Sequence, residues 1–230
     1  MRLAVQLYQF KYFKYNSHYW ILKILAQADR RLRILDVGTA DGYLGAILKA
    51  RGHWLVGVER EGAAAERAKS HYDAFHYADI EAFDFPYRDE FDYVLFADVL
   101  EHLRDPEAVL RRSLPCLKKD GEVIVSVPNI ANLVVRLSLL FGRFEYRDWG
   151  ILDRTHLRFF TLSSLNRLLQ NCGCDVIGRV ATPVPVQLVV PATDHRLFAP
   201  LHEFHYLLVR MWQTLLAYQF VVRAAPRTKK

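Results

Sequence analysis

Short runs of apolar residues alternate along the chain with longer stretches in which apolar residues recur every three or four positions. Residues 32–37 (LRILDV) and 91–98 (FDYVLFAD) are of the first kind, and residues 42–52 (GYLGAILKARG) are of the second. A short continuous apolar run predicts a strand buried on both faces, whereas the wider spacing predicts a helix. The alternation therefore predicts a parallel sheet covered by helices on both faces.

The expected elements can be placed by residue range. The expected strands are residues 32–37, 53–59, 74–79, 91–98, 118–128 (which begin with a turn that feeds the strand), 174–181 and 217–224. The expected helices are residues 18–30, 42–52, 62–72, 104–117, 129–144, 161–173 and 195–215. Asp105 with Pro106 is a typical helix start, Thr161 or Ser163 can cap another helix, and Gly173 can end it. The predicted fold class is α/β, a Rossmann-like, seven-stranded, mostly parallel sheet whose last strand is antiparallel.

No linker is long enough to separate two independent domains, so residues 1–230 are expected to form one domain. Within it we expect a helical cap (1–30), a cofactor-binding half (31–128), and a half for the acceptor (129–230) that ends in a helix and a strand. Residues 143–160 are polar and aromatic without a clear period, as in a lid or substrate loop.

Composition narrows the environment and the partners. The net charge is +6, but the basic residues are scattered, which favours a solvated basic surface over a nucleic-acid footprint. Three cysteines make no even disulfide framework, so we expect reduced thiols and a cytoplasmic protein. The N-terminal stretch has no long apolar segment of a signal peptide, and polar residues interrupt every long apolar stretch, so no spanning helix is expected.

A glycine-containing loop and two acids point to a nucleotide. Gly38 and Gly42 follow the first strand and open the first helix of the sheet, although Ala40 stands where dinucleotide fingerprints often have a second glycine. Glu59 ends the second strand about 20 residues on, where a carboxylate accepts both ribose hydroxyls. Asp79 follows the third strand, so the three loops should converge on one crevice.

These segments carry a family resemblance. The chain resembles the class I S-adenosylmethionine-dependent methyltransferases in "LDVGTADGYLG", "VGVER", "YADIE", "FDYVLFADVLEHLRDPEAVL" and "LKKDGEVIVSVPN", in the family's order over roughly residues 30 to 180. The resemblance implies that the cofactor is S-adenosylmethionine. It implies that Asp36, Gly38, Ala40 and Gly42 lie near the methionine part, Glu59 at the ribose, and Asp79 and Ile80 at the adenine. Asp41, Arg60 and Asp98 are further expected cofactor-binding residues.

A second cluster follows the fourth strand. Asp98, Glu101 and His102 stand at i, i+3 and i+4, so on a helix they would share one face. Such a set admits Mg²⁺, Mn²⁺ or Zn²⁺. The alternative is that His102 packs and Glu101 orients the cofactor or a loop, because Glu-His is common at this position in methyltransferases without a metal.

His156, in "DRTHLRFF", adds a further candidate. The chain resembles two metal-using branches, the small-RNA ribose methyltransferases and the ubiquinone-biosynthesis O-methyltransferases. That resemblance implies Asp98, Glu101, His102 and His156 as metal ligands, with Asp98 standing where those branches usually have Glu. The chain is most similar to bacterial methyltransferases associated with sugars and cell-surface polysaccharides, and there His156 would be a general base or an orienting group, with Glu101 and His102 as catalytic neighbours.

Four residues near His156 are candidate acceptor contacts. Arg154 and Arg158 suit a phosphate or carboxylate, or else an ordinary ion pair with Asp153 or Asp148. Tyr146 and Trp149 suit a sugar face, or else closure of the lid. The helix at 195–215 is interpreted as a cover for the sheet or a homodimer face, with a membrane-surface helix as the alternative.

Three functions remain at this point. The first is O-methylation of a small-molecule hydroxyl, most simply of a sugar or glycan precursor in polysaccharide biosynthesis. The second is metal-dependent O-methylation of RNA ribose or of a quinone- or catechol-type acceptor, and the RNA variant requires a continuous basic groove to His156. The third is a non-catalytic module that binds the cofactor and regulates a partner, with a lid too closed to admit an acceptor.

Overall fold

Seven strands form one mixed sheet in the order β3-β2-β1-β4-β5-β7-β6. The computed structural model describes residues 15–60, 62–186 and 195–227. The strands are β1 (Arg33–Val37), β2 (Trp54–Glu59), β3 (Ala74–Tyr77), β4 (Phe91–Ala97), β5 (Leu117–Pro128), β6 (Cys174–Thr182) and β7 (Gln219–Pro226). Strands β1 to β5 pair in parallel, and β7 runs antiparallel between β5 and β6. The predicted fold class is confirmed.

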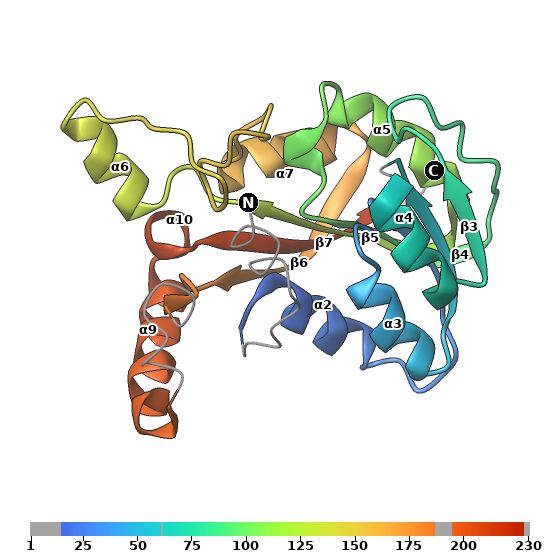
Figure 1. Cartoon of the computed structure of the whole chain (residues 1–230), viewed down its shortest axis with the longest axis horizontal. Helices are drawn as coiled ribbons and strands as arrows, with labels where there is room; N and C mark the ends of the chain where they lie inside the picture. The colour runs from blue at the N-terminus through green and yellow to red at the C-terminus, as the bar shows by residue number, and fades with distance from the viewer. Residues whose placement is uncertain (1–14, 61, 187–194, 228–230) are drawn as a thin grey trace.

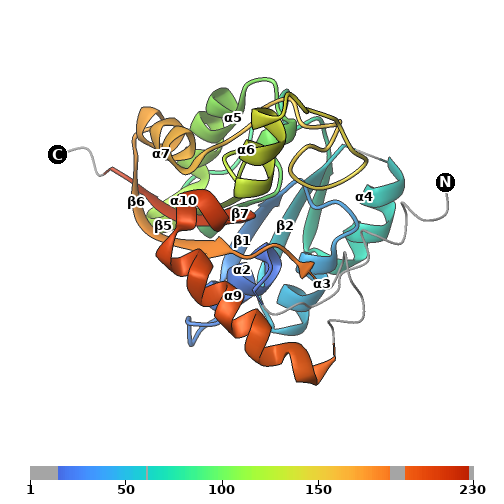
Figure 2. The same ribbon diagram turned by 90° about the vertical axis from the view of Figure 1, so that its left-hand side faces the viewer.

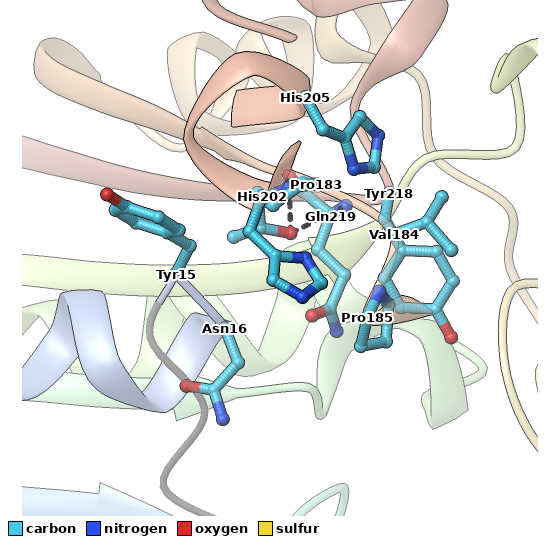
Figure 3. Close-up of a pocket in the computed structure, with 10 residues that line it drawn as sticks. Tyr15, Asn16, Pro183, Val184, Pro185, His202, His205, Tyr218 and Gln219 are labelled. Atoms are coloured by element: carbon cyan, nitrogen blue, oxygen red, sulfur yellow. Dashed lines mark hydrogen bonds between the residues drawn. The ribbon is translucent and has the colours of Figure 1, made fainter. Parts of the chain in front are cut away.

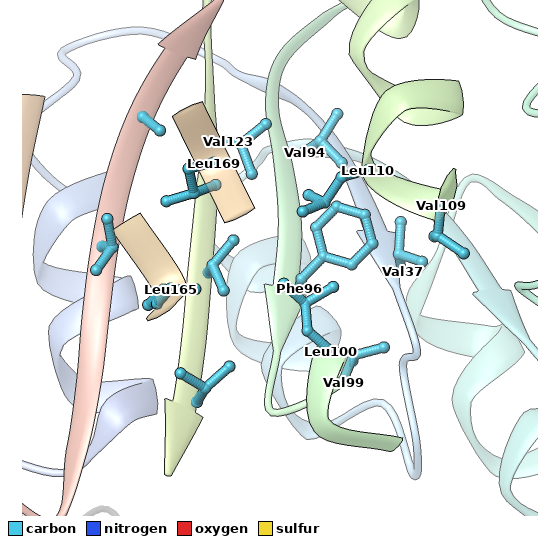
Figure 4. Close-up of a cluster of buried hydrophobic side chains, with 14 of the residues drawn as sticks. Val37, Val94, Phe96, Val99, Leu100, Val109, Leu110, Val123, Leu165 and Leu169 are labelled. Atoms are coloured by element: carbon cyan, nitrogen blue, oxygen red, sulfur yellow. The ribbon is translucent and has the colours of Figure 1, made fainter. Parts of the chain in front are cut away.

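Helices cover both faces of this sheet (Figure 1). The helices of the described residues are α2 (Ser17–Leu25), α3 (Tyr43–Ala50), α4 (Gly62–Ala68), α5 (Pro106–Ser113), α6 (Leu133–Leu140), α7 (Leu162–Asn171), α9 (Ala199–Met211) and α10 (Gln213–Leu216). Alternate residues of each strand point to opposite faces, so Leu35 joins the cluster under α5 and α7 while Ile34 joins the cluster under α2 and α3. Figure 4 shows Leu110, Leu165 and Leu169 packed against strand side chains in the first cluster.

Local sequence signals locate the helix ends. The Asp105 side chain accepts a hydrogen bond from Ala108 N at 2.9 Å, and Pro106 begins α5. Thr161 Oγ1 accepts from Ser164 N at 3.1 Å, so Thr161 rather than Ser163 caps α7. Gly173 follows α7 with a φ of +80°, as its predicted role as helix stop requires. The capping predictions are confirmed.

Two predicted elements differ from the structure. The turn expected before residue 122 is part of β5, which begins at Leu117 and shifts register opposite Phe91 and Tyr93. The helix expected at 195–215 is divided into a 3₁₀ turn at Arg196–Phe198, α9 and α10, with the break at Trp212. Val209 is the one buried residue of α9, so this helix does not cover the sheet with its apolar stripe.

The predicted subdivision of the chain and the loop at residues 143–160 can be compared with the structure. Residues 1–14 of the predicted cap lie outside the described residues, and the boundary predicted at residue 128 coincides with the end of β5. Residues 143–160 contain no helix, and their bridges are Arg147 with Asp153 and, at the end, Phe160 with Asn129. No helix among the described residues has both the length and the apolar character needed to span a bilayer.

Gly42 provides a test of how closely α3 and α4 approach. Its φ is +76°, and a Cβ built there would lie 2.7 Å from the Ala68 Cα. We expect Gly42→Ala to lower the free energy of unfolding by about 2 to 5 kcal/mol, about 1 to 2 from the left-handed backbone and the rest from overlap. The matched control is Gly52→Ala, with a φ of +83° and open space around it, which should lose only the first part. Urea unfolding measures both, and equal losses would contradict the close approach.

Candidate active site

The loop after β1 is held in a conformation that exposes its backbone. Gly38, Ala40 and Gly42 all have positive φ angles, +79°, +45° and +76°. Gly38 N donates to Val58 O at 2.8 Å, and a Cβ on Gly38 would lie 2.6 Å from Val99 Cγ2. The loop therefore lies against the side chain of Val99 and depends on a glycine at position 38.

The carboxylate of Glu59 joins this loop to the end of β2. Glu59 Oε2 accepts from Ala40 N, and Oε1 accepts from Arg60 N, both at 2.8 Å. Asp79 follows β3, where it accepts from Glu81 N at 3.0 Å and from Arg60 Nη1 at 3.3 Å. The structure thus brings Glu59 and Asp79 to the same edge of the sheet, because parallel strands have their carboxyl ends at one edge.

Two other acids of the predicted cofactor set have side-chain partners within the protein. Asp36 is buried and accepts from the hydroxyl of Tyr72 at 2.6 Å. Burial is the main cause that raises the pKa of Asp36 to about 6, and the charge of Glu59 acts in the same direction. Asp41 forms an ion pair with Arg67 at 2.6 Å near the mouth of the cleft.

One cleft of about 690 Å³ lies across the carboxyl ends of the parallel strands. It is lined by His18, Asp36, Gly38, Thr39, Ala40, Asp41, Tyr43, Leu44, Glu59, Arg60, Ala64, Arg67, Asp79, Ile80, Glu81, Ala97, Asp98, Val99, Glu101, His102, Leu103, Pro128, Gly150, Asp153, His156, Tyr218 and Gln219. This volume is in the range of small-molecule sites. All the predicted cofactor residues except Gly42 line it, together with all the predicted metal ligands.

Asp98 does not share a helix face with Glu101 and His102, so that prediction is wrong. Asp98 has a left-handed backbone with a φ of +58°, and only Leu100–His102 form a single 3₁₀ turn. The Asp98 carboxylate accepts from Ser126 Oγ at 2.6 Å and from Ser17 Oγ at 3.2 Å. These bonds direct Asp98 toward β5 and the start of α2, and it lies outside the group that Glu101 and the two histidines form.

Glu101 is a buried acid without a side-chain partner. It is 1% exposed, and neither carboxylate oxygen has a hydrogen bond with any described residue. Its backbone carbonyl accepts from Leu157 N at 2.8 Å and from Arg158 N at 2.9 Å, which fixes the turn against the late loop. Burial, and then the charge of Asp98, raise the pKa of Glu101 well above its ordinary value. Such a group is costly unless a ligand satisfies it.

Two imidazoles complete this group. One ligand atom from each of Glu101, His102 and His156 lies within 4.8 Å of the others, and the two rings are 4.9 Å apart between centroids. His156 Nδ1 lies 3.1 Å from Ile151 O, and His102 Nδ1 lies 3.2 Å from Thr155 O. A carbonyl only accepts, so each Nδ1 donates and each Nε2 keeps a lone pair. Burial, and then the charge of His102, lower the pKa of His156, which favours its neutral form.

Some residues of the site were not expected from the sequence. Asp153 is buried and accepts from Thr155 N at 2.8 Å and from Thr155 Oγ1 at 2.7 Å, so it shapes the turn that carries His156. An Asp two residues before a Thr is a typical turn signal that could have indicated this role. His18 enters the cleft from α2, and no local pattern indicates a contact so far away in sequence.

The four predicted acceptor contacts do not line the cleft. Arg154 pairs with Asp148 at 2.7 Å, and Arg158 Nε donates to Arg104 O at 3.1 Å. Tyr146 is exposed and lies against Phe144 and Phe159. Trp149 is half-buried. Their roles toward an acceptor stay predictions.

A smaller cavity of about 30 Å³ adjoins the cleft (Figure 3). Tyr218 and Gln219, at the start of β7, border both spaces. Figure 3 shows His202 and His205 of α9 together with Pro183, Val184 and Pro185 around this cavity. The carboxyl edge of the sheet is therefore hollowed from Glu59 and Asp79 as far as α9.

A family model described as "Methyltransferase domain" matches residues 11–178, which include the glycine loop, Glu59, Glu101 and His156. The chain belongs to this methyltransferase-domain family. The match confirms the predicted family. The same range carries both ends of the cleft, so the family assignment and the geometry concern the same residues.

Curated relatives are more specific in name. The chain is 36% identical over 104 residues to the ubiquinone biosynthesis O-methyltransferase of Bradyrhizobium diazoefficiens, covering 43% of this chain and 40% of that protein. It is 31% identical over 157 residues to the enzyme of the same name from Neisseria meningitidis serogroup C, covering 64% of this chain and 65% of that protein. The methyltransferase therefore spans less than two thirds of the length of these relatives.

Solved structures support the fold. A methyltransferase from Archaeoglobus fulgidus, described as SAM-dependent, superposes with a TM-score of 0.63 over 90% of this chain and 91% of its own, at 16% sequence identity. At this identity the likeness establishes the methyltransferase fold and its seven-stranded sheet.

Proposed function

We propose that this protein transfers the methyl group of S-adenosylmethionine to a hydroxyl of a small molecule. The observation that carries the proposal is the composition of the single cleft. One end has the glycine loop with Glu59 and Asp79, and the other has Glu101 with two imidazoles. The first end suits a nucleoside, and the second suits a group that must lose a proton.

The residues at the first end fit the cofactor. The Glu59 carboxylate lies at the end of β2, where ribose hydroxyls can donate to it, and Asp79 and Ile80 flank the adenine position. Gly38 and Ala40, with positive φ angles, line the cleft beside Asp36, and this loop would hold the methionine part. When bound, S-adenosylmethionine supplies an electrophilic methyl group on a sulfonium.

The residues at the second end fit a divalent cation. Glu101 offers two oxygens that no described residue satisfies, and His102 and His156 each offer an Nε2 lone pair fixed by a carbonyl at Nδ1. We therefore propose Glu101, His102 and His156 as ligands of Mg²⁺, Mn²⁺ or Zn²⁺. A cation there would lower the pKa of the acceptor hydroxyl. Asp98 is left out of this set because its two oxygens accept from Ser126 and Ser17.

The proposed acceptor is a phenol of the catechol or quinol type. The names of the relatives support this class, and the mixed nitrogen and oxygen ligands suit the phenolate that must form. The sugar or glycan acceptor expected from the sequence, with His156 Nε2 as the base that takes the hydroxyl proton, is the second candidate. RNA is not favoured, because Arg60 and Arg67 are the basic residues of the lining and lie at the cofactor end.

Metal binding and acceptor choice can be tested together. Calorimetry with Mn²⁺ on chelator-treated protein should give one site, lost in Glu101→Gln but kept in the surface control Glu107→Gln, whose carboxylate pairs with Arg111. Formation of S-adenosylhomocysteine should then be measured with an alkylated catechol and with nucleotide sugars. We expect turnover of the catechol, abolished by EDTA. Full activity after EDTA treatment would contradict the proposed role of a metal. Binding of S-adenosylmethionine without turnover of any acceptor would favour a regulatory module.

A further inference from the structure

Helix α6 presents most of its large apolar side chains to solvent. Val135 is its one buried residue. The exposed apolar residues of α6 and of the turn after it are Val134, Leu137, Leu139, Leu140 and Phe141, and the last two are 76% and 75% exposed. Monomeric proteins rarely leave so many large apolar side chains together in water.

The arrangement around the helix axis tells what kind of surface covers α6. Successive residues are turned by about 100°, so Val134, Leu137, Leu140 and Phe141 fall within roughly a third of the circumference, and Leu139 lies apart from them. An apolar stripe of this kind lets a helix lie in the plane of a membrane surface with its apolar side inserted. The same stripe also suits a second copy of the chain, and the measurements below distinguish the two.

A second apolar helix lies on the same side of the molecule. Figures 1 and 2 both show α6, α10 and α9 along one end of the sheet, and Figure 2 views that end directly. Leu201, Phe204, Leu207 and Met211 form an exposed stripe along α9. Asn132, which caps α6, donates to Ala217 O at 2.9 Å. Ala217 directly follows α10, so the start of α6 is fixed to the end of α10.

Basic side chains accompany this apolar surface. Arg136 on α6, and Arg143 and Arg147 just after it, are all exposed. Arg136 Nε donates to Ala131 O at 2.6 Å, which holds its guanidinium at the base of the helix. The same segment carries two acids, Glu145 and Asp148, and Asp148 is paired with Arg154. Apolar side chains bordered by arginines match a bilayer surface that carries anionic headgroups.

We propose that α6, together with the exposed stripe of α9, docks this protein onto an anionic membrane surface, so that the acceptor enters the cleft from the lipid. The docking depends only on the surface described above, whereas the lipid origin of the acceptor rests on the proposed function. Pro128 ends β5 five residues before α6, and Gln219 begins β7 three residues after α10. Both residues line the acceptor end of the cleft. An apolar acceptor would pass from the bilayer to Glu101 and His156 beside these helices.

The docking can be measured without any reaction. The protein should co-sediment with vesicles of equimolar phosphatidylcholine and phosphatidylglycerol, more weakly with phosphatidylcholine alone, and less at high salt. Leu140→Glu should weaken partitioning by about tenfold or more, because it puts a charge where an apolar side chain enters the interface. The control is Ile177→Glu on β6, where the side chain is also exposed, at 50%, but belongs to neither α6 nor α9.

Each result either supports or overturns the proposal. Equal partitioning of Leu140→Glu and Ile177→Glu, or no binding of the wild type to the anionic vesicles, would overturn it. So would a wild-type dimer in sedimentation velocity that Leu140→Glu converts to a monomer, since α6 would then bind a second copy. If vesicle binding follows the proposal but vesicle-borne catechols are no better acceptors than water-soluble ones, the docking stands and the lipid route for the acceptor fails.

Discussion

Replacing Glu101 by Gln should lower the rate of methyl transfer by at least about a hundredfold, the loss typical of removing a group that handles the acceptor proton. The amide has nearly the same shape, so the 3₁₀ turn at Leu100–His102 and its hydrogen bonds to the late loop should persist. What disappears is a carboxylate whose two oxygens have no hydrogen-bond partner among the described residues. The measurement is turnover under saturating S-adenosylmethionine.

The same substitution should stabilise the metal-free protein, and the gain should grow with pH. Unfolded Glu101 loses its proton near pH 4.5, whereas burial and the charge of Asp98 raise the pKa of the folded group. Above pH 4.5 the folded state therefore binds more protons than the unfolded state. Its free energy of unfolding falls as pH rises, until the folded carboxyl also ionises. Because Gln has no titrating proton, the free energy of unfolding of Glu101→Gln should not fall in this way as pH rises.

Two measurements decide the role of Glu101. Urea unfolding from pH 5 to pH 8, after chelation, should show the difference between variant and wild type widening. Glu107→Gln, an exposed acid paired with Arg111, is the control and should change neither activity nor the pH slope. A Glu101→Gln variant with wild-type turnover would show that the unpartnered carboxylate has no part in the reaction.

Glu59→Ala should weaken S-adenosylmethionine binding by about 2 to 4 kcal/mol, a factor of roughly 30 to 1,000, the cost of two charge-assisted hydrogen bonds. The expected bonds are those from the two ribose hydroxyls. The substitution also removes the bond from Ala40 N to the carboxylate, which loosens the glycine loop. Calorimetry with S-adenosylhomocysteine measures the loss directly.

The control for this substitution is Glu66→Ala. Glu66 lies on α4, where its carboxylate contacts Lys69 and the Tyr77 hydroxyl, and it does not line the cleft. The Glu66→Ala variant should bind S-adenosylhomocysteine with the affinity of the wild type. If Glu59→Ala also bound it with wild-type affinity, the nucleotide end of the cleft would be assigned to the wrong residues.

The sheet was predictable because each strand carries its own signal. Continuous apolar runs such as residues 93–97 predict burial on two faces, and the caps at Asp105 and Thr161 are local. The insertion of β7 between β5 and β6 has no local signal, since it depends on pairings between residues at least 37 positions apart. The division of the last helix at Trp212 was missed because the apolar spacing continues through it.

The site was predictable to the extent that motifs are local. Glu59 and Asp79 follow strands that must end at one edge, so their convergence follows from the topology. Asp98 was misplaced because three-to-four spacing implies a helix, whereas its left-handed backbone and its bonds to Ser126 and Ser17 turn it away. The contribution of His18 and the exposure of α6 depend on tertiary packing, which spacing does not report.

The position of β7 has a consequence for synthesis of the protein on the ribosome. Phe220, Val221 and Val222 are fully buried, and β7 is the strand that joins β6 to the rest of the sheet. A nascent chain that has emerged only as far as residue 218 can assemble β1 to β5, but it leaves β6 and one edge of β5 unpaired. Such an open edge invites pairing with other chains. During synthesis, this edge therefore stays open to other chains until residue 226 has left the ribosome and β7 has paired with both neighbours.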